Sequence, residues 1–268
     1  MMERITSRKN PLLMKIRRLA SGGRRERQAE GEYLGDGIKL LEEALRWSAP
    51  LTAAVFADGV EPPDLPKEVR AVQVPGDVME SISPMAAPQG ALFLAALPPA
   101  DPPEQLKGRR YLVLDGVQDP GNVGTIWRTA DALGADGLLL VNGCADPYGP
   151  KVVRASMGAC FRLPVFEVTP DGLAGLLKKA ELPLYATALG KDTVDLKTAD
   201  LSRSAVVIGS EGRGVSRPLL ERCEKTLKIP MRQRCESLNA AVAASIVLWE
   251  MGRWSSQRGG RPPIPRQW

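Results

Sequence analysis

The chain has 268 residues, with 36 Lys and Arg against 31 Asp and Glu, and it contains no histidine. The missing histidine excludes hydrolases built on a Ser–His or Cys–His pair, and the four cysteines form no Cys-x-x-Cys pair, so we expect no metal site. The longest apolar stretch, Ala240–Trp249, is far shorter than the ~20 residues that a membrane span needs, and no secretory signal opens the chain. We therefore expect a cytoplasmic protein with reduced cysteines.

Positive charge gathers at the two ends of the chain. Residues 1–27 contain nine Lys and Arg against two Glu, and residues 252–268 contain four Arg and no acid. Such clusters favour contacts with the phosphates of a nucleic acid over a merely solvated face. We expect 252–268 to be a flexible basic tail. The predicted nucleic-acid contacts are Arg8, Lys9, Arg17, Arg18, Arg24, Arg25 and Arg27, together with Lys151 and Arg154 from a later helix.

The first hundred residues predict a small α/β domain. Apolar residues recur at helical spacing in two segments, and three short, mostly apolar segments predict strands. The two helices are expected near Pro11–Leu19 and Ile38–Trp47, and the strands near Thr52–Ala57, Val69–Val74 and Ala91–Leu97. Four prolines between positions 98 and 103 then indicate a stiff linker. We expect a first domain over 1–100 and a second over 101–251.

After the linker, strand-like and helix-like segments alternate, which indicates a parallel sheet covered by helices. Strands are predicted near 111–114, 138–141, 163–168, 184–188, 205–208 and 227–229, and helices near 122–133, 150–159, 171–180, 216–222 and 238–251. No Gly-x-Gly-x-x-Gly follows the first of these strands, and no P-loop pattern occurs in the chain. Ordinary dinucleotide and P-loop nucleotide sites are therefore disfavoured.

The loop Gly209–Gly214 follows the buried strand predicted at Ala205–Ile208. Parallel α/β sheets bind ligands at the carboxyl ends of their strands, and three glycines in six residues let the main chain approach a ligand. Glu211 adds a carboxylate to this loop. A tight turn with an exposed acid is an equally good interpretation, and the loop alone does not decide between the two.

A second polar loop, 115–124, leads into the helix that carries Arg128. A loop of this kind at a helix N-terminus can hold an anion on free N–H groups, and Arg128 would project beside that anion. In the alternative interpretation, Asn122 caps the helix and Arg128 pairs with Asp131 three residues later.

Taken together, these segments resemble the SpoU (TrmH-like) branch of the SPOUT superfamily of RNA ribose 2′-O-methyltransferases. The resemblance covers about residues 109–251 and includes a helix at 151–159. Its three motifs appear in order and at suitable spacing as 120–131, as 208–214, and as 229–231 with 236–240. The N-terminal segments 5–11 and 33–37 resemble the family's L30e/L7Ae-like substrate-binding domain.

Two positions depart from the family pattern. Asp36 stands where relatives commonly have glutamate, which keeps the charge. Gln233 stands where many have glycine, which places a side chain in the cofactor loop.

The resemblance implies a deep trefoil knot in the second domain, a homodimer with active sites completed across its interface, and S-adenosylmethionine as cofactor. No metal is implied. Leu238 is expected to lie against the adenine. The expected cofactor-binding residues are Ala188, Leu189, Gly209, Glu211, Gly214, Ile229, Met231, Ser237, Leu238 and Asn239.

Five polar residues match the family's catalytic residues, namely Asn122, Arg128, Glu211, Ser237 and Asn239. The resemblance places Arg128 where the ribose hydroxyl is activated. A guanidinium is always protonated and is a poor base, so we hypothesise that Arg128 binds the ribose-phosphate and stabilises the developing alkoxide. A substrate phosphate would assist proton removal.

The separate N-terminal domain favours 23S ribosomal RNA as substrate. Three alternatives stay open at this point: a tRNA 2′-O-methyltransferase, a non-catalytic RNA-binding protein of the same fold, and base methylation through a nucleophilic Cys223 or Cys235.

Overall fold

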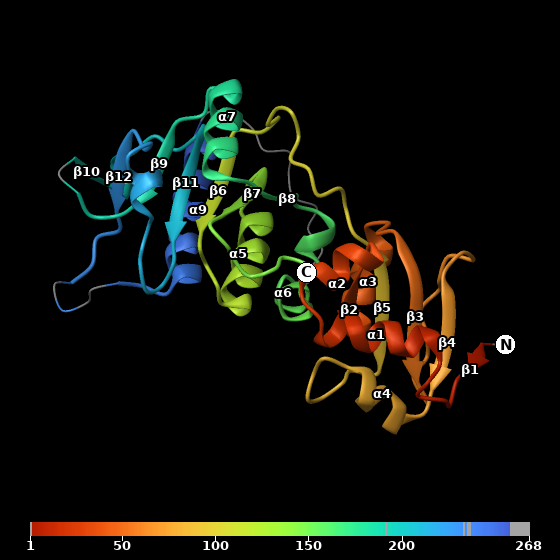
Figure 1. Cartoon of the computed structure of the whole chain (residues 1–268). Helices are drawn as coiled ribbons and strands as arrows, with labels where there is room; N and C mark the ends of the chain where they lie inside the picture. The colour runs from red at the N-terminus through yellow and green to blue at the C-terminus, as the bar shows by residue number, and fades with distance from the viewer. Residues whose placement is uncertain (1, 191, 233, 235–236, 258–268) are drawn as a thin grey trace. The chain divides into compact units, whose positions relative to one another are not determined.

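The computed structural model describes residues 2–190, 192–232, 234 and 237–257. The chain forms two compact units, each with its own sheet. Residues 1–100 and 146–162 make the first unit, and residues 101–145 and 163–268 make the second. The change from the first unit to the second after Ala100 falls within the proline-rich stretch (Figure 1).

The first unit is built on a five-stranded sheet. The strand order is β1 (Glu3–Arg4), β4 (Arg70–Val74), β3 (Leu51–Ala57), β5 (Ala91–Ala96) and β2 (Glu32–Asp36). β3 runs parallel to β4, whereas β5 is antiparallel to both β3 and β2. Because neighbouring side chains of a strand point to opposite faces, Val55 and Phe56 of β3 belong to different hydrophobic cores.

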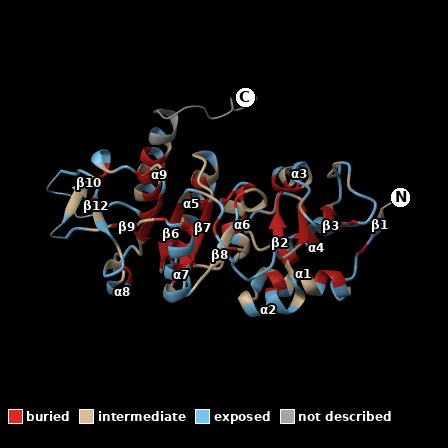
Figure 2. Ribbon diagram, turned by 90° about the horizontal axis from the view of Figure 1, so that it is seen from above, coloured by how far each residue is buried: buried red, intermediate tan, exposed pale blue. Residues whose placement is uncertain are grey.

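Helices cover both faces of this sheet. Helices α1 (Pro11–Ser21) and α4 (Gly76–Ile82) pack in the core that contains Val55, and α3 (Ile38–Arg46) packs in the core that contains Phe56. Figure 2 shows the buried residues on the strands and on the helix sides that face them. The short helix α2 (Arg24–Glu30) and strand β2, neither of which was predicted, follow α1. Helix α4 was also missed.

Residues 146–162 lie in the first unit, although the sequence places them in the second domain. Val153, on α6 (Pro150–Ala155), is fully buried in the core of that unit, and the ring of Tyr148 lies 5.0 Å from that of Tyr33. The helix predicted over 150–159 stops at Ala155 and is followed by the 3₁₀-helix Ala159–Phe161. Positive φ angles at Met157 (48°) and Gly158 (86°) break it.

The second unit contains a parallel sheet, as predicted, with seven strands rather than the six expected. Its order is β10 (Thr193–Asp195), β12 (Lys225–Lys228), β9 (Leu184–Thr187), β11 (Ser204–Gly209), β6 (Arg110–Asp115), β7 (Gly137–Val141) and β8 (Val165–Glu167). The covering helices are α5 (Pro120–Ala132), α7 (Pro170–Ala180), α8 (Arg217–Leu220) and α9 (Ala240–Gln257). The central strands are continuous apolar runs because the sheet is covered on both faces. β10 and the 3₁₀-helix Leu196–Thr198 were not predicted.

Helix α9 continues to Gln257, so residues 252–257 are helical where the sequence predicted the start of a flexible tail. The remainder of that tail, 258–268, lies outside the described residues. Within the described part of the chain, no helix is both long enough and apolar enough to cross a membrane.

Candidate active site

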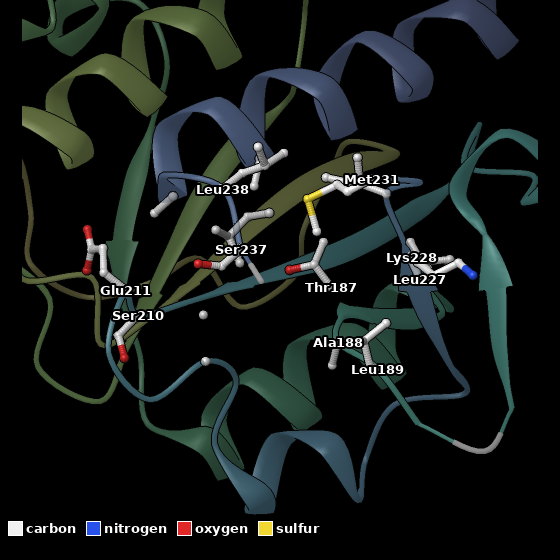
Figure 3. Close-up of a pocket in the computed structure, with 16 residues that line it drawn as sticks. Thr187, Ala188, Leu189, Ser210, Glu211, Leu227, Lys228, Met231, Ser237 and Leu238 are labelled. Atoms are coloured by element: carbon white, nitrogen blue, oxygen red, sulfur yellow. The ribbon is translucent and has the colours of Figure 1, made fainter. Parts of the chain in front are cut away.

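A cavity of about 300 Å³ opens at the carboxyl ends of β9, β11 and β12, beside the start of α9 (Figure 3). Its volume is at the lower end of the usual range for small-molecule sites. Nine of the ten predicted cofactor residues line it: Ala188, Leu189, Gly209, Glu211, Gly214, Ile229, Met231, Ser237 and Leu238. Of the other lining residues, Ile208, Ser210 and Ala240 lie in the motifs without having been assigned to the cofactor, and the motifs do not include Thr187, Leu227, Lys228 and Ala243.

The glycine-rich loop is both a tight turn and a wall of this cavity. Ser210 and Gly214 exchange two backbone hydrogen bonds, of 2.9 and 3.1 Å, and Gly214 has a φ of +65°. A Cβ at Gly209 would stand 2.1 Å from the carbonyl carbon of Gly214, so the turn closes only with glycine there. The two interpretations left open by the sequence therefore describe one structure.

A buried carboxylate anchors the segment that follows this loop. Asp115, at the end of β6, is 3% exposed. Its Oδ2 accepts a 2.6 Å hydrogen bond from the backbone N–H of Ser216, and its Oδ1 accepts one of 2.6 Å from the amide of Asn142. The end of β6 and the segments that follow β7 and β11 are thus joined through one side chain.

Three predicted catalytic residues form a hydrogen-bonded chain. Asn239 caps α9, since its Oδ1 accepts from the N–H groups of Ala241 (2.9 Å) and Val242 (3.2 Å). Its amide nitrogen therefore faces Asn122, and donates to Oδ1 of Asn122 at 3.0 Å. The amide nitrogen of Asn122 in turn donates to Oε1 of Glu211. In each hydrogen bond of this chain the donor is therefore on the side of α9 and the acceptor on the side of Glu211, whose carboxylate lines the cavity.

The structure contradicts the alternative interpretation of the α5 terminus. Asp119, not Asn122, caps the helix, because its Oδ1 accepts from the backbone N–H of Asn122 at 2.7 Å. Arg128 is exposed and forms no hydrogen bond or ion pair with any described residue, so the expected pair with Asp131 is not formed. Arg128 is also not joined to the chain that contains Asn122, and Ser237 lines the cavity as an exposed residue.

Arg27 is not placed to bind RNA. It is 4% exposed, and its guanidinium donates to Asp146 Oδ2 at 2.5 and 2.8 Å. It also donates to the carbonyls of Leu19 (3.2 Å) and Gly22 (2.9 Å), so nearly all of its donors are used inside the first unit. A buried arginine with four of its five donors used in this way is a structural residue, and the sequence prediction is corrected at this position.

The other predicted RNA contacts differ in how free they are. Arg8 pairs with Asp77 at 2.7 Å and Arg18 with Glu30 at 2.5 Å, while Arg17 donates to Ser81. Of the five predicted contacts that remain, Lys9, Arg25 and Lys151 are exposed, and Arg24 and Arg154 are half-buried.

Arg154 approaches a buried carboxylate. Its Nη1 lies 3.6 Å from Oδ1 of Asp36, which is 3% exposed, and the other carboxylate oxygen accepts from Ser83 Oγ at 2.8 Å. Burial raises the pKa of Asp36, and the hydrogen bond from Ser83 and the charge of Arg154 only partly oppose this shift.

The cysteines do not offer a nucleophile in the described structure. Burial raises the pKa of Cys223 to about 12 and that of Cys144 to about 11, which keeps both thiols protonated at neutral pH. Neither lines the cavity, and Cys235 lies outside the described residues. Among described residues no group of three or more potential ligands could hold a metal ion.

A parallel α/β sheet with a ligand cavity and a polar chain at its carboxyl edge defines an α/β enzyme of the kind that binds a cofactor at strand ends. Residues 109–249 match the SpoU rRNA Methylase family, and residues 3–92 match an MRM3-like substrate binding domain. The chain therefore belongs to the SpoU rRNA Methylase family.

Individual relatives agree with this assignment. A 23S rRNA (guanosine(2553)-2′-O)-methyltransferase of Bacillus subtilis is 31% identical over 93% of this chain and 99% of its own length. The mitochondrial rRNA methyltransferase 3 of Homo sapiens is 32% identical over 84% of this chain and 68% of its own. The structure of an AdoMet-bound rRNA methyltransferase from Sinorhizobium meliloti has a TM-score of 0.83 at 29% identity, covering 94% of this chain and 98% of that one.

These comparisons confirm the family, the α/β fold with an N-terminal substrate-binding domain, and the class of enzyme, an RNA methyltransferase that uses S-adenosylmethionine. The roles of the individual residues stay predictions.

Proposed function

We propose that this protein transfers a methyl group from S-adenosylmethionine to the 2′-hydroxyl of a ribose in 23S ribosomal RNA. The observation that carries the proposal is the chain Asn239–Asn122–Glu211, which reaches the cavity through Glu211. The 23S rRNA methyltransferase of Bacillus subtilis, which matches 93% of this chain, supports ribosomal RNA as the substrate. The MRM3-like substrate binding domain supports it independently of the catalytic motifs.

The cavity walls suit the cofactor. Leu189, Met231 and Leu238 are 77%, 41% and 36% exposed, and all three line the cavity (Figure 3). Apolar side chains exposed around one hollow indicate a ligand with an apolar face, and an adenine ring offers such a face. When bound, S-adenosylmethionine supplies an electrophilic methyl group on a positively charged sulfonium.

Glu211 provides the complementary charge. It is the one acid among the described residues that line the cavity, so its carboxylate can hold the cationic part of the cofactor. Since Asn122 donates to Oε1, the other carboxylate oxygen is left to face the ligand. The fixed donor direction through Asn239 and Asn122 positions Glu211 before the ligand arrives, and such preorganisation lowers the barrier of an in-line transfer.

Arg128 is proposed to bind the ribose-phosphate of the RNA. It is exposed on α5, and no described residue uses its N–H donors. A guanidinium stays protonated, so it stabilises the alkoxide that develops at the 2′-oxygen, while a substrate phosphate assists proton removal.

We further infer that two copies of the chain form a homodimer that completes each active site. Val242 and Trp249 lie seven positions apart on α9 and are 48% and 64% exposed, which supports packing against a second copy. Within one copy no hydrogen bond between described residues joins Arg128 to the chain Asn239–Asn122–Glu211, which supports an arginine contributed by the partner.

Mixing inactive variants tests this arrangement. Arg128→Ala and Glu211→Ala are each expected to be inactive, and equal mixing after subunit exchange should restore about a quarter of the wild-type activity, since half of the dimers would then hold one intact site. If the mixture stays inactive although exchange is verified, the shared site is wrong.

We also infer a deep trefoil knot in the second unit and a cytoplasmic location. Strand order supports the knot, because β12 inserts between the earlier strands β9 and β10 before the chain continues into α9. An experimentally traced chain that could be pulled straight from its ends would contradict the knot, and recovery of the protein from a membrane or secreted fraction would contradict the location.

Labelled-methyl transfer tests the function itself. Purified protein is incubated with labelled S-adenosylmethionine and either unmodified 23S ribosomal RNA or bulk tRNA, and the methylated riboses are mapped. We expect label at one 23S ribose and none with Arg128→Ala. Label in tRNA alone would move the target, and cofactor binding without transfer to free RNA or to ribosomal particles would favour a non-catalytic RNA-binding protein.

A further inference from the structure

Trp47 in the first unit is half exposed, with a guanidinium over its ring. Its exposed fraction is 51%. It follows the last residue of α3, and Cζ of Arg162 lies 5.5 Å from the centroid of its ring. Neither residue belongs to the cavity or to the predicted RNA contacts. The function proposed above therefore assigns no role to this pair.

Glu43 holds this arrangement in place. One of its carboxylate oxygens accepts from Arg162 at 2.5 Å, and the other accepts from Arg46 at 2.8 Å. Gly158 allows the close approach, since a Cβ there would stand 3.0 Å from Cβ of Glu43, and its φ is +86°. The ring and both guanidiniums are thus positioned by ordered elements, α3 and the segment 146–162.

The chemistry of this cluster fits one unpaired nucleobase. Flat bases stack on aromatic rings and on arginine planes, and they do so most readily in single-stranded RNA. Arg162 over the ring leaves about half of the Trp47 surface open to a second flat group. Arg46 and Arg162 both donate to Glu43, and the Arg46 side chain is 70% exposed, so its charge can meet an adjoining phosphate.

We propose that Trp47 is a stacking platform for one unpaired base of the RNA substrate, with Arg46 beside the phosphate of that nucleotide. The inference rests on the proposed function, because it takes RNA as the substrate, and it deepens that function by assigning a single-stranded contact to the first unit.

The test compares Trp47→Ala, Trp47→Phe and Met14→Ala for binding to transcribed 23S ribosomal RNA over a series of salt concentrations. Met14 is the matched control, since it is an apolar side chain of the same unit with a similar exposed fraction, 46%. We expect Trp47→Ala to weaken binding roughly 5- to 100-fold, the range for loss of one stacked base, and Trp47→Phe to retain most of the affinity. Met14→Ala should bind like the wild type.

Salt dependence separates stacking from charge. Stacking releases no counterions, so Trp47→Ala should lower affinity without changing the slope of log K against log salt, whereas Arg46→Ala should reduce that slope by about one. In methyl transfer, Trp47→Ala should raise KM for RNA and leave kcat at saturating RNA unchanged. Unaltered cofactor affinity and Tm would show that the variant is folded.

Two outcomes overturn the proposal in distinguishable ways. If the wild type methylates 23S ribosomal RNA and Trp47→Ala binds it within twofold of the wild type, the platform is wrong and the proposed function stands. If the wild type neither binds nor methylates that RNA, the proposed function fails and the platform fails with it.

Discussion

Asp115 accepts a hydrogen bond from the backbone N–H of Ser216, which lies 101 positions later in the chain, at 2.6 Å. The loop that carries Glu211 lies between Gly209 and Ser216, so its far end is anchored on this carboxylate. Asp115 does not line the cavity. The shape of the cavity therefore depends on a buried residue that does not line it.

The variant Asp115→Asn keeps the size of the side chain but turns one acceptor into a donor. That NH₂ group must face a donor, either the N–H of Ser216 or the amide of Asn142. We expect a loss of roughly 2–3 kcal/mol in the free energy of unfolding, as for a buried charged hydrogen bond. We also expect about tenfold weaker binding of S-adenosylmethionine by calorimetry, since one tenfold step costs only ~1.4 kcal/mol. Asp171→Asn, at a carboxylate 89% exposed, is the control and should change neither quantity measurably.

The variant Asn122→Asp tests the direction of the polar chain. It would place a second carboxylate against Oε1 of Glu211, where Asn122 now donates. Like charges at this distance raise the pKa of one carboxyl group, so we expect lower activity than in Asn122→Ala at pH 8 and a partial recovery as pH falls. Initial rates of methyl transfer between pH 5.5 and pH 8.5 would show this recovery. RNA binding, titrated over the same pH range, would separate a change in RNA affinity from a change in catalysis. Equal activity of the two variants at every pH would contradict the assigned direction.

Two neighbouring arginines on α2 are expected to behave differently. Arg27→Ala leaves Asp146, whose side chain is only 18% exposed, without its ion-pair partner and should cost roughly 3 kcal/mol of stability. Arg25 is exposed, so Arg25→Ala should leave the free energy of unfolding within ~0.5 kcal/mol and weaken RNA binding with a smaller salt slope. Urea denaturation and RNA titration on both variants decide the matter. A stable Arg27→Ala protein with weakened RNA binding would restore the sequence-based assignment.

Asp36 should make stability depend on pH. Burial raises its pKa in the folded state above the unfolded value, so its contribution is fully present below the unfolded pKa and is lost as pH rises through the folded pKa. We expect the free energy of unfolding of the wild type to fall, relative to Asp36→Asn, as pH increases above about 4. Denaturant titrations at several pH values measure this difference.

Asp58 provides a control of opposite sign. The hydrogen bond from Arg4 and its charge lower the pKa of this exposed carboxyl group. Its contribution to stability is therefore present above the unfolded pKa and is lost as pH falls. The wild type should lose a small part of its free energy of unfolding at acid pH, and Asp58→Asn should not. The same trend with pH in both variants would refute the assignment for Asp36.

Local patterns predicted most of the second unit. Buried parallel strands are continuous apolar runs, so Ala205–Ile208 identified β11 (Ser204–Gly209) with an error of one residue at each end. The resemblance to the SpoU family supplied the expected cofactor residues, and the structure brings nine of the ten to one cavity. The strand could be located because its signal lies in a short segment, and the roles of the residues that line the cavity stay predictions.

The errors have a common cause, which is long-range partnership. Arg27 looked like a surface cation because its partner, Asp146, lies 119 positions away. No spacing rule connects Asn239 with Asn122 across 117 positions either.

The assignment of residues 146–162 to the first unit has a consequence for protease resistance. The chain passes between the two units three times, after Ala100, after Ala145 and after Arg162. A single cut in the proline-rich stretch would remove one connection and leave two, and the fragment 1–100 would still hold residues 146–162 through Val153 and the pair of Arg27 with Asp146. The protein should therefore stay associated after such a nick, and neither half can be exchanged with a relative's by joining chains at one point.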